Sequence, residues 1–201
     1  MRDRAVIAPW RGLLAVWLGL LILGGATGCK STPKTSGLSL KDLSGKAVPI
    51  SQLAGSRGCV LVYVAVDCPI ANRAVPELLS LACEFKAVGM PVYFVHASAF
   101  ESVAEIRQHS KEYGIDVPVL RDVGQGVARQ YEAHVTPEAV ALTGEGRLIY
   151  RGRINDQHSA LGQDRPQPTQ HDLADAVRDY LTGGIATGRV VPAVGCTFRS
   201  L

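Results

Sequence analysis

A cysteine lies at the junction between an apolar run and a segment with helical spacing. The run covers residues 59–66 (CVLVYVAV), and Asp67, Cys68 and Pro69 follow it. Proline fits the first position of a helix, where no N–H is needed, so Cys68 is expected to be the N-cap. The free N–H groups and the positive end of the helix dipole favour a thiolate there. These residues predict an exposed, reactive thiol; the alternative is a small apolar residue that closes a strand.

The side chains around Cys68 could tune it. Asp67 would oppose thiolate formation if its carboxylate came close, and we expect that carboxylate to point to solvent. Asn72 and Arg73 belong to the first helical turn. They could hydrogen-bond a substrate or a later proline loop, and Arg73 could stabilise the thiolate. The alternative is that both are ordinary solvated helix residues.

The chain offers Cys68 a distant partner. Cys196 lies in a C-terminal segment with glycine and proline but no clear period. We hypothesise that it is a resolving cysteine, which attacks a sulfenate or a mixed disulfide at Cys68. The alternative is a stray thiol in the tail. Cys59 and Cys83 fall in the apolar run and on the following helix, where core packing is expected and a structural bridge between them is the alternative.

The surrounding pattern predicts the elements that position these thiols. Residues 59–66 are apolar on both faces, which predicts a central strand in a covered, largely parallel sheet. The next helix has its apolar face at Val75, Leu78, Leu79, Ala82 and Phe85, contains Pro76 and ends at Gly89. Further expected elements are an edge hairpin in 38–53, a strand over 92–96, a helix to about 113, an extended piece at 118–120, a short helix over 126–132, a hairpin of strands 137–143 and 148–154, and a last helix over 170–181. The helix to about 113 has two candidate starts, because Ser102 and Glu105 fit a capping box and Ser98 and Glu101 fit the same pattern one turn earlier.

The N-terminus is typical of a secretory signal. Arg2, Arg4 and Arg11 precede the apolar stretch 12–25, and small residues stand directly before Cys29. This ending resembles a bacterial lipobox, which implies cleavage before Cys29 and lipidation of its thiol; ordinary signal-peptidase cleavage or an uncleaved anchor are the alternatives. The net charge is only +3 and no basic block stands out, which gives nucleic acid binding no support.

Three features together resemble the thioredoxin-like superfamily, in its exported redoxin branch with TlpA-like and AhpC/TSA-like members. They are the strand–Cys68–helix unit with Pro76 eight residues later, Val135-Thr136-Pro137 before a strand, and the hairpin of residues 138–153. The resemblance implies a thioredoxin-like α/β sandwich, with a mixed central sheet and helices on both faces. It also implies that Thr136 and Pro137 form a cis-proline loop beside Cys68, and that His134 lies near the thiol. The alternative for His134 is a loop side chain facing water.

The chain departs from the family at the active-site turn. The family's second cysteine of Cys-x-x-Cys is Ala71 here, so a dithiol exchange confined to this motif is impossible. The peroxiredoxin pattern is absent, since its proline and threonine positions are Leu61 and Ala65. The second cysteine of copper chaperones with Cys-x-x-x-Cys is replaced by Asn72. Of the remaining histidines, His96 could line the site; His109, His158 and His171 are expected at the surface.

We expect four segments: a signal peptide (1–29), a flexible tether (30–37), a thioredoxin-like domain (38–182) and a tail carrying Cys196 (183–201). The leading hypothesis is an exported thiol oxidoreductase that needs no cofactor and is lipid-anchored in a bacterial cell envelope, facing the periplasm. In it Cys68 attacks a protein disulfide or a peroxide, and Cys196 or an external thiol resolves the product. The alternatives are a copper(I) module that uses Cys68, His134 and Cys196, and a thioredoxin-fold interaction module without catalysis.

Overall fold

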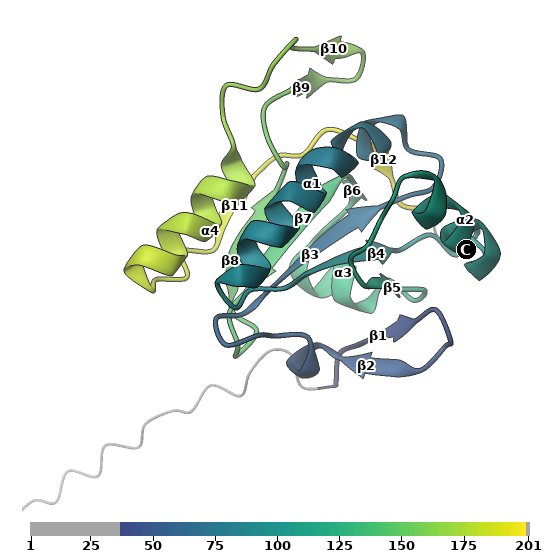
Figure 1. The fold of residues 1–201 in the computed structure, drawn as a ribbon, viewed down its shortest axis with the longest axis horizontal. Helices are drawn as coiled ribbons and strands as arrows, with labels where there is room; N and C mark the ends of the chain where they lie inside the picture. Colours follow the sequence, from purple (N-terminus) through teal and green to yellow (C-terminus); the bar gives the residue numbers. More distant parts are fainter. Residues whose placement is uncertain (1–36, 200–201) are drawn as a thin grey trace, which may run out of the picture. The chain divides into compact units, whose positions relative to one another are not determined.

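A computed structural model describes residues 37–199 of the chain (Figure 1). The expected signal peptide, Cys29 and most of the tether lie outside these residues. The central feature is a sheet of eight strands in the order β11-β8-β7-β3-β4-β5-β1-β2. The elements, in chain order, are β1 (Ser39–Asp42), β2 (Ala47–Pro49), a 3-10 turn (Ile50–Gln52), β3 (Cys59–Val64), α1 (Pro69–Ala87), β4 (Val92–His96), α2 (Val103–Glu112), β5 (Val119–Arg121), α3 (Gly126–Tyr131), β6 (Val135–Thr136), β7 (Glu138–Leu142), β8 (Leu148–Gly152), β9 (His158–Ala160), β10 (Gln163–Asp164), α4 (Asp172–Gly183), β11 (Arg189–Val191) and β12 (Cys196–Thr197).

The sheet is mixed. Strand β3 pairs in parallel with β4 and antiparallel with β7, and all six of its residues are buried. The pairs β4–β5 and β8–β11 are parallel, whereas β1–β2, β1–β5 and β7–β8 are antiparallel. The central position of β3 is therefore confirmed, but the expectation of a largely parallel sheet is wrong, because the hairpins β1–β2 and β7–β8 also pair antiparallel with β5 and β3.

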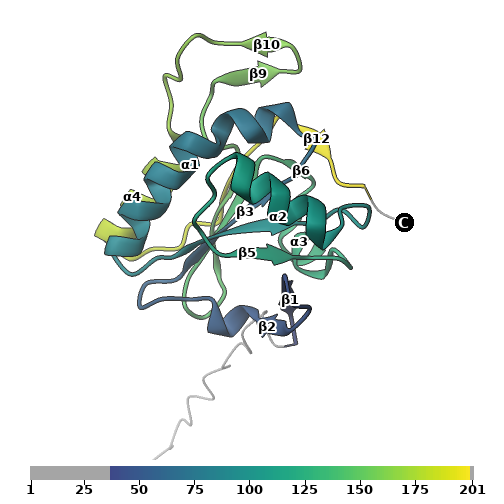
Figure 2. The same cartoon turned by 45° about the vertical axis from the view of Figure 1, so that its right-hand side comes forward.

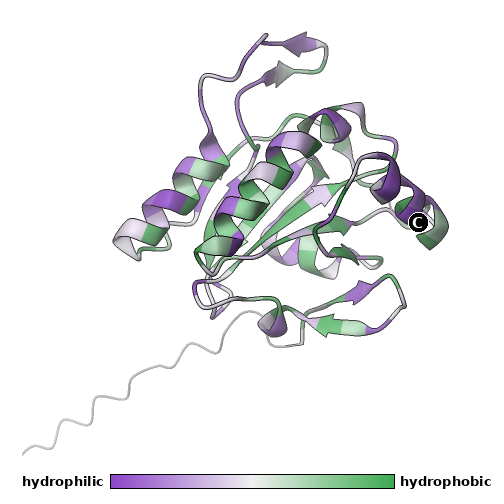
Figure 3. Cartoon of the chain, in the orientation of Figure 1, coloured by the Kyte–Doolittle hydropathy of each residue, from purple (hydrophilic) through white to green (hydrophobic). Residues whose placement is uncertain are grey.

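Helices cover both faces of the sheet. On one face, Val60, Val62 and Phe94 pack with the apolar sides of α1 and α4. On the other face, Leu61, Tyr63 and Val95 pack with α3 and the β1 region. The hydropathy colouring in Figure 3 shows how continuously apolar β3 and β4 are. Alternate residues of one strand thus enter two cores, which explains the absence of a polar face in the sequence. The predicted α/β sandwich is confirmed.

The ends of the helices follow their sequence signals. Cys68 is the N-cap of α1, Pro69 is the first helical residue, and Pro76 lies inside the helix. Helix α2 starts at the second of its two candidate sites, because Ser102 and Glu105 form a complete capping box. Ser98, the earlier candidate, instead accepts a hydrogen bond from the N–H of Phe100 through its hydroxyl oxygen.

The C-terminal segment, for which the sequence predicted no secondary structure, extends the sheet. Residues 189–191 form β11, which pairs in parallel with β8 and is an edge strand of the sheet. Gly152 permits this approach: its φ is +147°, and a Cβ there would lie 1.9 Å from the carbonyl oxygen of Val191. The chain then runs to β12, which pairs with β6 beyond the start of α1 (Figure 2).

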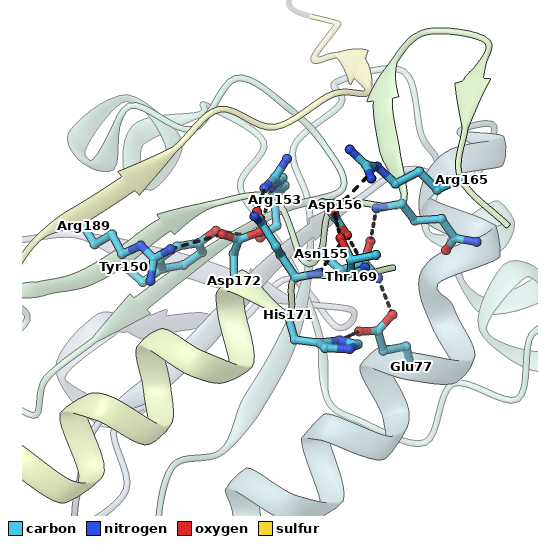
Figure 4. A network of polar contacts seen from close by, with 12 residues as sticks. Glu77, Tyr150, Arg153, Asn155, Asp156, Arg165, Thr169, His171, Asp172 and Arg189 are labelled. Carbon is cyan, nitrogen blue, oxygen red and sulfur yellow. Dashed lines mark hydrogen bonds and ion pairs between the residues drawn. The ribbon is translucent and has the colours of Figure 1, made fainter. Parts of the chain in front are cut away.

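A polar network fixes the connection between β8 and α4, where the β9–β10 arm projects from the domain (Figures 2 and 4). Asp156 accepts hydrogen bonds from the N–H and hydroxyl of Thr169, both at 2.6 Å. The amide of Asn155 donates to Glu77 on α1. This connection is thereby tied to the helix that begins at Cys68. Within residues 37–199, no helix has the length and apolar character to cross a bilayer.

Candidate active site

Cys68 lies at the junction that the sequence indicated, but it is buried. Its sulfur accepts a hydrogen bond from the N–H of Ala71 at 3.4 Å and, as a thiol, donates to the carbonyl oxygen of Thr136 at 3.0 Å. The residue has 0% relative exposure. The expected position at a helix N-terminus is thus found, whereas the expected exposure is wrong, because other chain segments cover the turn.

The segment that covers Cys68 is the C-terminal strand β12. Cys196 lies opposite Thr136 and Thr197 opposite Val135 in antiparallel register. The Thr136–Pro137 peptide bond is cis, and the hydroxyl of Thr136 donates to the carbonyl oxygen of Cys196 at 3.4 Å. The two distant cysteines are therefore neighbours, joined through Thr136. Both are free thiols in this structure.

The environment of Cys196 keeps its thiol protonated. Burial, a hydrogen bond with Cys68 and the negative charges of Cys68 and Asp67 raise the pKa of Cys196 to about 11, while Arg199 acts in the opposite direction. Of the two sulfurs, Cys196 therefore holds its proton firmly while it lies beside Cys68.

Two side chains after Cys196 hold β12 in place. The ring of Phe198 packs against that of Tyr63 with the centroids 5.2 Å apart, and its N–H donates to the carbonyl oxygen of His134 at 3.1 Å. Arg199 lies 3.3 Å from the carboxylate of Asp67, with both side chains largely exposed. Asp67 thus points to the surface as expected, where it pairs with the tail.

A buried carboxylate and an amide hold the turn before Cys68 from the inside. Glu101 accepts a hydrogen bond from the N–H of Val66 at 2.6 Å, and its other oxygen lies 3.1 Å from Nδ1 of His96. The amide of Asn72 donates to the carbonyl oxygen of Val66 at 3.0 Å. Both polar groups of Val66 are therefore fixed by side chains from different elements, which restrains the turn that carries Cys68.

The same network reaches His109 on α2. Because the amide nitrogen of Asn72 faces a carbonyl, its Oδ1 faces His109, and Nε2 of His109 is the donor across 2.7 Å. Burial and the neighbouring His96 lower the pKa of His109, partly opposed by Glu101 and Glu112. His109 Nδ1 and His96 Nε2 find no polar partner among the described residues. His109 is thus a buried neutral imidazole, and the expectation of a surface histidine is wrong.

Several candidate residues have other contacts than expected. Arg73 pairs with Asp164 of β10, so it is held away from the thiol. Asn72 contacts Val66 and His109, not the proline loop. His134 is exposed, as in the alternative of a loop residue facing water. Its backbone joins the site by accepting from Phe198.

The remaining cysteines differ from each other. Cys59 is buried in β3 as expected, and burial raises its pKa to about 12. Cys83 is exposed on α1, so the expectation of core packing is wrong for this residue. Within residues 37–199, no three His, Cys, Asp or Glu side chains are grouped so that they could hold a metal ion. Cys68, His134 and Cys196 accordingly form no such group.

Glu101 and Phe198 are the site residues that the sequence did not indicate. Glu101 fitted a helix-start pattern with Ser98, which hid its contact with Val66. Phe198 belongs to no periodic pattern in the sequence. The only hint was that an aromatic residue follows the tail cysteine by two positions, which is compatible with a docked strand. A cavity of about 260 Å³ lies beside them, and Asp67, Phe100, Glu101, Cys196, Phe198 and Arg199 are among its lining residues.

Residues 33–152, which include Cys68 and Pro137, match the model of the AhpC/TSA family. The chain belongs to the AhpC/TSA family. The matched region ends before β11 and β12, so Cys196 lies beyond the part that defines membership. Over 110 residues the chain is 26% identical to the thiol-disulfide oxidoreductase ResA of Bacillus subtilis (strain 168), covering 55% of this chain and 60% of that protein.

Solved structures support the same fold. A hypothetical protein from Sinorhizobium meliloti 1021 is 27% identical, with a TM-score of 0.68 over 82% of this chain and 91% of that one. The thioredoxin domain of a thiol-disulfide oxidoreductase from Bacteroides vulgatus is 17% identical, with a TM-score of 0.53 over 72% of this chain and 92% of that one. The chain therefore has the thioredoxin-like fold. It spans about three-fifths of the curated relative that it matches.

Proposed function

We propose that this protein is a thiol-disulfide oxidoreductase whose working pair is Cys68 and Cys196. The observation that carries the proposal is the register of β12, in which Cys196 lies opposite Thr136, the residue whose carbonyl oxygen accepts from the thiol of Cys68. Membership of the AhpC/TSA family and the name of the Bacillus subtilis relative favour the same chemistry. The tail thus replaces the partner that is absent at Ala71.

The proposed reaction cycles the pair between two thiols and one disulfide. In the oxidised protein Cys68 and Cys196 share an S–S bond. Two substrate thiols are oxidised to a disulfide while this bond is reduced, and the two protons remain on the enzyme pair or go to solvent. The reverse direction reduces a protein disulfide. With a peroxide, a sulfenate forms on one cysteine and the other thiol displaces water from it.

Mapping of the disulfides tests this function. The reduced protein is treated with excess oxidised glutathione or hydrogen peroxide and digested, and the bridged peptides are identified by mass spectrometry. We expect a Cys68–Cys196 bridge that is lost in Cys196→Ser and kept in Cys83→Ser, since Cys83 is an exposed thiol away from the pair. If Cys68 stays unmodified while copper(I) binds tightly, a metal module replaces this proposal. If neither reagent affects Cys68, an interaction module does.

We also propose export and lipid anchoring, on the basis of the basic and apolar residues before Cys29. The expected mature protein begins at a lipidated Cys29 and faces the periplasm of a bacterial envelope, where its substrates are protein thiols and disulfides. The test is the mass of the mature N-terminal peptide after expression in a bacterium, together with partition into the detergent phase. Cys29→Ser should remain water-soluble or unprocessed, whereas Cys83→Ser should behave as the parent; a parent protein without lipid contradicts the proposal.

A further inference from the structure

The two sulfurs of the pair differ in their access to solvent. Cys68 has 0% relative exposure, whereas Cys196 is partly exposed. The cavity of about 260 Å³ beside the turn has Cys196 in its wall but not Cys68. A second, smaller cavity on the other side is lined by Ile70, Pro137 and Val194, again without Cys68. An external molecule that enters either cavity therefore cannot touch the sulfur of Cys68.

Residues 195–199, which we call the strap, produce this shielding. A Cβ on Gly195 would lie 2.1 Å from the carbonyl oxygen of Thr136, which shows how closely the strap approaches β6. Phe198 anchors it on Tyr63, and the backbone carbonyl of Arg199 accepts from the N–H of Ala99 at 3.3 Å. The strap is also held by its pairing with β6 and by the ion pair between Arg199 and Asp67, and in this docked position it covers Cys68.

We propose that Cys196 is the sulfur that external thiolates attack, and that Cys68 reacts only within the pair. This assignment rests on the proposed function and reverses the order of attack expected from the sequence. It follows from the position of the strap, because attack on a disulfide requires access to the sulfur along the S–S axis. The cavity wall contains Cys196 but not Cys68, and the same arrangement in the bridged protein leaves only Cys196 open to such an attack.

The exchange at Cys196 proceeds in two steps, and each step breaks one bond to sulfur and forms another. A substrate thiolate attacks Cys196 of the Cys68–Cys196 disulfide, forming a substrate–Cys196 disulfide and releasing Cys68 as a thiolate. The N–H of Ala71 stabilises this leaving group through the hydrogen bond to its sulfur. A second substrate thiolate attacks the substrate sulfur of the mixed disulfide, which gives the substrate disulfide and reduced Cys196. Cys196 takes a proton from solvent, and the pair has gained two electrons.

The cysteine that glutathione attacks first can be identified in the parent protein, since the two cysteines compete within the same chain. The full-length protein is oxidised to the Cys68–Cys196 bridge, exposed briefly to reduced glutathione and then quenched with excess N-ethylmaleimide, which traps the released thiol. Mass spectrometry then counts glutathione on each cysteine. We expect at least about tenfold more glutathione on Cys196 than on Cys68, with maleimide on Cys68. Equal adducts, or more on Cys68, overturn the assignment while leaving the proposed function intact.

A matched pair of variants tests whether the strap causes the preference of glutathione for Cys196. Phe198→Ala removes the contact with Tyr63, so the preference for Cys196 should fall by at least about threefold. Val190→Ala alters a half-exposed residue of β11 in the same C-terminal segment and should keep the parent ratio. Circular dichroism confirms folding, and Phe198→Leu replaces Phe198→Ala if the latter fails to fold. An unchanged ratio in a folded Phe198 variant would contradict the claim that the strap shields Cys68. If no bridge forms in the parent protein, the proposed function and this assignment both fail.

Discussion

Cys196 lies opposite Thr136 in antiparallel register, although 60 residues separate them along the chain. Thr136 is also the acceptor for the thiol of Cys68. One backbone carbonyl and one strand pairing therefore bring together two cysteines that come from the start of α1 and from the C-terminal segment. The close approach depends on Gly195, which has no side chain to collide with β6.

Gly195→Ala should detach the strap. Its Cβ would meet the carbonyl oxygen of Thr136 at 2.1 Å, so the backbone must move. We expect the rate of Cys68 alkylation by iodoacetamide to rise by about tenfold or more and the yield of the Cys68–Cys196 bridge to fall. Gly183→Ala is the control, because a Cβ there meets nothing within 4 Å. Equal alkylation rates in both variants would show that the strap does not limit access.

Glu101→Ala should destabilise the turn before Cys68. The substitution leaves the part-buried N–H of Val66 without its 2.6 Å partner, and it removes the acceptor beside His96. An unsatisfied buried donor costs about 2 kcal/mol, and urea unfolding should show a loss of that order. Glu112→Gln, at an exposed position, should change little. A loss no larger than that of this control would mean that water replaces the carboxylate.

His109 should make stability depend on pH. Because its pKa is lowered from 6.5 in the folded protein, the unfolded chain binds more protons between the two values, and stability rises with pH. The contribution is lost as the pH falls below about 6.5, with a slope of at most about 1.4 kcal/mol per pH unit. Urea unfolding from pH 7 to pH 5 measures it.

In His109→Gln the amide can still donate to Asn72, so this variant should flatten the slope without removing the hydrogen bond. His134→Gln, at an exposed loop position, should keep the parent slope. A slope that is identical in the parent and in His109→Gln would assign the pH dependence to other groups.

Local sequence signals predicted the framework but not the assembly of the site. The N1 proline at Pro69, the capping box of Ser102 and the apolar run of β3 act through neighbours in sequence, and each is found as expected. Strand β12 has two residues and exists only through its pairing with β6, so it has no local signature. His109 could have been recognised as inward-facing, since it lies three residues after the buried Ile106 on the same helix.

Asp156→Asn should loosen the connection between β8 and α4. Hydrogen bonds from the hydroxyl of Thr169 and the N–H of Gln170 hold the pKa of Asp156 well below its ordinary value of 3.8 (Figure 4). An asparagine amide at the Oδ2 position can donate to the Thr169 hydroxyl, but it cannot pair with the guanidinium of Arg165, which lies 3.5 Å from that oxygen, so this ion pair is lost. We expect faster cleavage by subtilisin within residues 157–171, detected by mass spectrometry. Asp179→Asn, an exposed residue of α4, is the matched control. Because the folded-state pKa of Asp156 is depressed, its stabilisation is present above pH 3.8 and is lost as the pH falls through the folded value, so the comparison of cleavage rates is made at neutral pH. Cleavage at the same rate in both variants would show that the β9–β10 arm is held without Asp156.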